Sequence, residues 1–203
     1  MKNSKLIGGL LGLSLALPLA MSTGRAQQPQ QPSSKVTAKT ANFVLLPETT
    51  GTGDWVTLLC NNIKTPNLKD LFITASFEAG LYTRTQTTDT STSSAKASVQ
   101  VRVLLDGQEV EPGPTIYANR LQTLSTSLGP TETVQFILDT MNASSFSYVA
   151  VDVPVGVHQV CVQARVDTSG SGDFSALGGV GKGTLTVEEV RLIKNEDVVE
   201  MAP

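Results

Sequence analysis

Val99-Gln-Val-Arg-Val-Leu-Leu-Asp-Gly107 is the stretch that decides the fold. Its valines occupy alternate positions as far as Val103, so an extended segment would have one apolar and one more polar face, which is the period of a half-buried strand. Asp106-Gly107 follows directly, and both residues tolerate the positive φ that a two-residue hairpin turn requires. The sequence therefore predicts a β-hairpin, with Gln108–Val110 as the returning strand.

The longest alternating pattern begins at Leu71 and ends at Tyr82. Apolar residues fill one face of this stretch and mostly polar residues fill the other, so it predicts one long half-buried strand rather than a helix. Thr83–Ser94 follows, with nine Ser or Thr in twelve residues. This segment is too polar to bury, and we expect it to end in an exposed loop and to offer a contact region.

Shorter alternating or apolar runs predict further strands along the chain. They cover residues 42–46, 55–60, 121–128, 133–138, 145–153, 157–166 and 184–193. No segment has a convincing helical period. Nine or ten strands joined by turns predict an all-β fold, namely a two-sheet antiparallel β-sandwich with jelly-roll or other Greek-key topology.

The first 26 residues have the pattern of a secretory signal peptide. Two lysines precede an apolar run from Leu6 to Ala20, and Gly24 and Ala26 supply the small residues of a cleavage site. The apolar run is shorter than the roughly 20 residues that a membrane-spanning helix needs. We therefore expect residues 1–26 to be removed and the mature chain to be secreted or periplasmic, without membrane insertion.

Composition divides the remaining chain into three parts. Residues 27–39 are rich in Gln, Pro and Ser and have no apolar period, which predicts a flexible spacer. Residues 40–194 carry the strand patterns and are predicted to form the β-sandwich domain. Residues 195–203 form an acidic C-terminal tail.

The charge balance bears on the class of partner. The chain has 15 Lys and Arg against 18 Asp and Glu, and its signal peptide contains basic but no acidic residues. The mature chain is therefore acidic, whereas phosphate binding needs a basic face. We expect no nucleic-acid partner. A protein or a glycan is the expected partner, and the sequence leaves the oligomeric state open.

Cys60 and Cys161 are the two cysteines of the chain. An even cysteine count in an exported protein predicts one disulfide, and the wide spacing does not suit a redox or zinc motif. Their orientation stays open at this point. Cys161 alternates with Val160 and Val162, so either a β-bulge intervenes or both faces of this strand are covered.

Three segments together resemble a known kind of domain: Val101–Val110, Val155–Arg165 and Gly183–Val187. They look like the hairpin and closing strands of secreted bacterial β-sandwich domains and, more distantly, of jelly rolls of the C1q and tumour-necrosis-factor type. The resemblance spans residues 98–193 and depends on the alternation of strands and turns. It implies a β-sandwich and assigns no functional site.

The sequence offers little for catalysis. His158 is the one histidine, and it follows a predicted turn, where we expect an ordinary polar surface position. Glu109 and Glu111 lie beside the predicted hairpin, while Glu188 and Glu189 are adjacent in a strand and would point to opposite faces. No nucleophile motif and no cofactor fingerprint is present. We therefore expect a protein that is not an enzyme and has no cofactor.

A weak calcium motif lies near the C-terminal end of the domain. Asp167, Ser169, Ser171 and Asp173 place oxygen atoms at alternate positions, as the opening of a calcium loop does. The twelfth position is Gly178, so the bidentate glutamate is missing. A Gly/Ser loop without metal is the expected structure.

These observations favour an exported, non-catalytic β-sandwich that serves as a structural, adhesive or macromolecule-binding module. A carbohydrate-binding module is the alternative, because sugars stack on exposed aromatic rings. Tyr82 and Trp55 are the possible ligand contacts. Exposure of these two side chains next to each other would favour the alternative.

Overall fold

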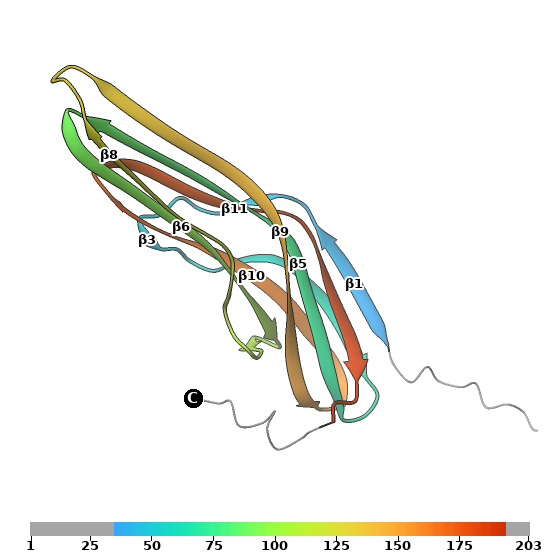
Figure 1. Ribbon diagram of the computed structural model, residues 1–203. Coiled ribbons are helices and arrows are strands. Elements are labelled where there is room, and N and C mark those ends of the chain that lie inside the picture. The colour runs from blue at the N-terminus through green and yellow to red at the C-terminus, as the bar shows by residue number, and fades with distance from the viewer. Residues whose placement is uncertain (1–34, 194–203) are drawn as a thin grey trace, which may run out of the picture. The chain divides into compact units, whose positions relative to one another are not determined.

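The computed structural model describes residues 35–193, which form two packed antiparallel sheets (Figure 1). This range contains eleven strands and no helix. The strands are β1 (Val36–Ala41), β2 (Val44–Leu45), β3 (Gly51–Thr52), β4 (Val56–Thr65), β5 (Lys69–Thr88), β6 (Thr90–Leu105), β7 (Gln108–Glu109), β8 (Thr115–Ser127), β9 (Thr133–Val153), β10 (Gly156–Ser171) and β11 (Asp173–Val190). The predicted signal peptide and the predicted acidic tail lie outside the described residues.

The strand order is that of a jelly roll. Sheet A has the order β1-β11-β5-β9, and β2 also pairs with β11. Sheet B has β10 and β6 at its centre, with β3 and β4 along β10 and with β7 and β8 along β6. Of the eight longer strands, the first, eighth, third and sixth in chain order form sheet A, and the second, seventh, fourth and fifth form sheet B. The predicted antiparallel sandwich is therefore confirmed.

The core lies between the two sheets and follows the predicted alternation. Odd-numbered residues of β5 from Leu71 to Leu81 are buried, and so are Val99, Val101 and Val103 of β6. Even-numbered residues of β10 lie beside the β6 valines in sheet B, and together they face the β5 residues of sheet A. Its buried apolar side chains are Val160, Val162, Ala164 and Val166.

The buried face of β5 continues through threonines beyond Leu81. Thr83, Thr85 and Thr87 are almost completely buried, and the turn to β6 comes at Asp89, whose φ is 59°. The prediction that this segment is too polar to bury was wrong for its first half. Residues 88–92 are exposed around this turn, but Thr90–Ser94 belong to β6 and Ser93 is buried, so the end of the segment is strand rather than the expected exposed loop.

Two predicted boundaries also need correction. β1 begins at Val36 and pairs with β11, so residues 36–39 belong to sheet A rather than to the spacer. The strands expected at 133–138 and 145–153 are one continuous strand, β9. The predicted hairpin is confirmed: Asp106 and Gly107 have φ values of 50° and 84° between β6 and the short β7.

Candidate functional site

β9 is the free edge of sheet A (Figure 1). It pairs with β5 on one side, and on the other side an isolated bridge joins Val149 to Glu111. The Val149 N–H donates to the Glu111 carbonyl oxygen at 3.0 Å, so the backbone groups of Val149 point away from β5. Alternate residues of a strand point their backbone groups the same way. The N–H and C=O groups of the odd-numbered residues from 135 to 147 therefore face outward, and no strand within residues 35–193 pairs with them.

Both faces of β9 expose large apolar side chains. Phe136 and Phe146 lie on the face toward sheet B and are 48% and 43% exposed, because sheet B ends at β8. Ile137 and Met141 lie on the outer face and are 49% and 53% exposed.

Natural edge strands are often protected by Lys, Pro or a bulge. The sequence of β9 contains no Lys, Arg or Pro, and its register with β5 is regular from Thr133 to Val149.

Side chains of β8 contact β9 from the sheet B side. Gln122 donates to the Phe136 carbonyl oxygen at 2.8 Å, and Arg120 donates to the Leu138 carbonyl oxygen at 2.9 Å. The Ser144 hydroxyl donates in turn to the backbone of β8. These bonds hold the edge strand in place without covering its outer backbone groups.

Tyr82 lies on the outer face of sheet A, beside a shallow groove of about 270 Å³. Gly80 and Gly179 are opposite each other in β5 and β11, and their lack of side chains opens the groove. Phe43 and Met141 flank them: a Cβ atom on Gly179 would lie 3.1 Å from the Phe43 ring. The surface of the groove is mostly apolar.

Trp55 packs on the outer face of sheet B against two arginines. The guanidinium carbons of Arg102 and Arg165 lie 4.3 and 4.5 Å from the centre of the indole ring, which is cation–π geometry. Arg102 donates to Gln163, and Arg165 donates to Gln100. The half-buried indole is thus held by the protein's own cations.

Tyr82 and Trp55 therefore lie on the outer faces of different sheets. Tyr82 belongs to β5 in sheet A, while the two arginines that hold Trp55 belong to β6 and β10 in sheet B. The structure does not bring these two aromatic residues together into one stacking platform.

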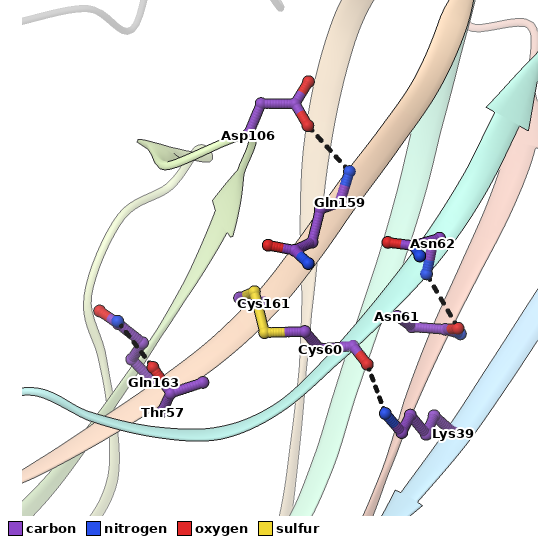
Figure 2. The surroundings of a disulfide bond; sticks show 9 residues. All are labelled: Lys39, Thr57, Cys60, Asn61, Asn62, Asp106, Gln159, Cys161 and Gln163. Carbon is purple, nitrogen blue, oxygen red and sulfur yellow. Dashed lines mark hydrogen bonds between the residues drawn. A yellow bond between two sulfur atoms is a disulfide. The ribbon is translucent and has the colours of Figure 1, made fainter.

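Cys60 of β4 and Cys161 of β10 form the predicted disulfide, which Figure 2 shows between the two neighbouring strands. The two cysteines are opposite each other in the register, with their Cα atoms 4.1 Å apart. The register between β4 and β10 shifts by one residue at Leu58, which has no partner in β10. Because of this extra residue, Val56 and Leu59 both lie opposite core-facing residues of β10. Of the two alternatives left open above, the bulge is correct. Disulfides are typical of oxidising compartments.

His158 is buried, so the expectation of a surface position was wrong. Its Nδ1 lies 2.7 Å from an Asp106 carboxylate oxygen and its Nε2 lies 2.9 Å from the Pro154 carbonyl oxygen. Both partners are acceptors, and the imidazolium form satisfies both with its two N–H groups. The hydrogen bond to Asp106 raises the pKa of His158, and the same bond lowers the pKa of Asp106.

The residues of the weak calcium motif lie mainly on extended strand. Asp167, Ser169 and Ser171 belong to β10, and Gly172 makes the turn to Asp173 at the start of β11. Successive residues of a strand advance by about 3.3 Å, so Asp167 and Ser171 are roughly 13 Å apart along β10. The expected Gly/Ser loop is thus a one-residue turn between two strands.

Both aspartates of this motif have basic partners. Asp173 accepts a hydrogen bond from Arg84 at 2.8 Å, and an Asp167 oxygen lies 3.6 Å from Arg165. Among residues 35–193, no three His, Cys, Asp or Glu side chains are grouped as a metal site would require.

The four candidate catalytic glutamates are dispersed over the domain. Glu109 pairs with Arg102 at 3.2 Å, and Glu111 contributes its carbonyl oxygen to the bridge with β9. Glu188 is half-buried, while Glu189 is buried with an oxygen 3.9 Å from Lys35. The different burial of these last two agrees with the prediction that they point to opposite faces.

In the described part of the chain, there is no helix of sufficient length and apolarity to span a membrane.

Sequence reasoning missed the β9 edge. The available signal was the absence of Lys, Arg and Pro across residues 133–153. That absence becomes informative only when the position of β9 at the end of sheet A is known.

No protein-family model and no curated protein matches the chain. Solved structures of infectious bursal disease virus show a distant likeness. The structure of the Gx strain has 12% identity and a TM-score of 0.36 over 77% of this chain and 32% of that chain. The structure of the Gt strain has 14% identity and a TM-score of 0.33, and the match covers 88% of this chain and 37% of that chain. The structure of the VP2 subviral particle has 11% identity and a TM-score of 0.29, and the match covers 83% of this chain and 41% of that chain. This chain thus spans well under half the length of each, and at these scores the likeness carries no functional argument.

Proposed function

We propose that this chain is an exported, non-catalytic module that binds another macromolecule in a structural or adhesive role. The observation that carries the proposal is the free edge of β9, with outward backbone groups from residue 135 to residue 147 and exposed apolar side chains on both faces. An added strand would gain affinity from backbone hydrogen bonds and specificity from the flanking side chains.

The surroundings of the histidine support a non-catalytic role. Both ring nitrogens of His158 are engaged, one with Asp106 and the other with the Pro154 carbonyl group. A general base needs a free nitrogen that faces a substrate. The pair instead ties the β6–β7 turn to the β9–β10 turn.

Export is supported by two independent features. The N-terminal sequence has the pattern of a signal peptide, and the disulfide of Cys60 with Cys161 suits an oxidising compartment. A module that acts outside the cytoplasm meets envelope and secreted macromolecules first.

The test compares two lysine substitutions of exposed apolar residues. Ile137→Lys places a charge on the β9 edge, while Val157→Lys places the same charge on β10, where the side chain is 68% exposed. Each tagged protein is cross-linked in the producing cells and its bound macromolecules are identified by mass spectrometry. We expect Ile137→Lys to lose partners that the wild type and Val157→Lys keep.

Equal partner sets for all three proteins would contradict the proposed role of β9. A hydrolytic activity of the wild type that disappears in His158→Ala would contradict the non-catalytic assignment.

A further inference from the structure

We infer that the β9 edge pairs with β9 of a second copy of this chain, antiparallel, about a twofold axis at Met141. The inference rests on the proposed function, since it names a partner for the same edge. A twofold axis makes the same patch serve both copies, so the edge must be complementary to itself. The limits of the edge, its side chains and its charges all meet this condition.

The free part of the edge is centred on Met141. It begins with the strand at Thr133 and ends at Val149, whose N–H already donates to Glu111. Residue 141 lies midway between these limits. In an antiparallel pair about this residue, each outward-facing odd residue from 135 to 147 meets another outward-facing residue, so all of their N–H and C=O groups find partners.

The same register matches the side chains on the face toward sheet B. Phe136 lies opposite Phe146 of the second copy, and Phe146 lies opposite Phe136 of that copy, which joins the most exposed aromatic rings of β9. Thr140 lies opposite Asn142 of the second copy, so polar side chains meet near the axis. Aromatic pairs across strands stabilise a sheet, and these occur twice by symmetry.

The charges of β9 are compatible with this register. Asp139 lies opposite Ala143 of the second copy, so no like charges face each other. The two Asp139 side chains are four residues apart along the paired strands, which is about 13 Å and exceeds the roughly 8 Å screening length at physiological salt.

The neighbouring register, centred on residue 142, fits less well. It would require the outward N–H of Val149, which is already bonded to Glu111. It would also place Phe136 opposite Tyr148, which is fully buried and bonded to Thr115. The structure therefore favours Met141 over residue 142 as the centre.

The test is a pair of cysteine variants. In the inferred pair, the Cα atoms of the two Met141 residues are about 5.5 Å apart, within the range of a disulfide. We expect Met141→Cys to give a covalent dimer under mild oxidation, identified as a 141–141 linked peptide. Ser145→Cys is the matched control, because its two copies are eight residues, or about 26 Å, apart. It is expected to remain a monomer on a non-reducing gel.

Sedimentation of the unmodified mature protein provides a second measurement. We expect twice the monomer mass at high concentration, and a shift to the monomer in Met141→Lys but not in Val157→Lys. A monomer at all concentrations, a trimer, or equal cross-linking of both cysteine variants would overturn the inference. The proposed function fails separately, through equal partner sets for Ile137→Lys and Val157→Lys in the producing cells.

Discussion

His158 joins two turns at one end of sheet B through both nitrogens of its ring. One bond reaches Asp106, whose other carboxylate oxygen accepts from the Gln159 N–H at 2.8 Å, and the other reaches the Pro154 carbonyl oxygen. The histidine thus fixes the hairpin turn of β6 and β7 against the start of β10. One side chain therefore links the β6–β7 turn to the β9–β10 turn.

The titration of this pair predicts a pH-dependent stability. The pKa of His158 is raised in the folded state, so its contribution is complete below about pH 6.5 and is lost as the pH rises through the folded pKa. The pKa of Asp106 is lowered, so its contribution is present above about pH 3.9 and is lost as the pH falls through its folded pKa. Stabilisation by the pair is therefore greatest from about pH 4 to 6.5.

We expect His158→Ala to lower the stability by about 1 kcal/mol at pH 6, because hydrogen bonds at the two turns are lost. The measurement is urea unfolding of wild type and variant from pH 5 to 9. The difference between them should shrink toward high pH. His158→Gln also lacks a titrating ring, so its difference from the wild type should shrink in the same way. A difference that does not change with pH would contradict the charged form of His158.

A second prediction concerns the disulfide. Cys60 and Cys161 are 101 residues apart in sequence, so their bond restricts a long loop in the unfolded chain. We expect reduction to lower the unfolding free energy by a few kcal/mol, up to about 4.7, without unfolding the domain, since a core of this size remains stable. Urea unfolding curves recorded with and without reductant measure this loss of unfolding free energy. Uptake of two alkyl labels by the denatured, unreduced protein would show free thiols and contradict the bond.

At the scale of strands, the sandwich interior changes from apolar to polar along β5. Beyond Leu81, the Thr83 hydroxyl donates to the Gln122 side-chain oxygen, and the Gln122 amide donates to the Thr85 hydroxyl, both at 2.7 Å. Gln122 also donates to the Phe136 carbonyl oxygen of β9. One buried amide of sheet B therefore links two strands of sheet A.

Gln122→Leu tests this link. The change leaves buried partners on Thr83, Thr85 and Phe136 without their hydrogen bonds, so we expect a loss of roughly 1–3 kcal/mol in the unfolding free energy. Replacing both threonines with valine in the same background should recover part of the loss. Leu121→Ala is the control, because Leu121 is 68% exposed and should change stability by no more than about 0.5 kcal/mol. Equal effects of Gln122→Leu and Leu121→Ala would contradict the buried link.

These elements also show what the sequence could predict. The alternation from Leu71 to Tyr82 and the Asp106-Gly107 turn are local patterns, and both predictions were confirmed. Burial of Thr83 depends on Gln122, which is 39 residues away, so a local pattern could not indicate it. β9 was divided into two strands because an edge strand with both faces exposed has no clean alternation to detect.

At the scale of the whole described domain, the candidate surface follows from the order of strands in the sheets. β9 lies at an edge only because β5 separates it from β11, and this arrangement depends on contacts between distant parts of the chain. The sequence indicates Tyr82 and Trp55 as side chains for binding, but their separation onto two sheets cannot be derived from their spacing. The backbone of an edge strand carries no residue motif at all.

Residue-resolved amide hydrogen exchange of the mature protein tests the role of β9 most directly. The even-numbered amides from 134 to 148 pair with β5 and should be protected at every protein concentration. If β9 is the surface of association, the odd-numbered amides from 135 to 147 should exchange rapidly in dilute protein and become protected as the concentration rises. Rapid exchange of these odd-numbered amides at all concentrations, including those at which the mass increases, would contradict this account.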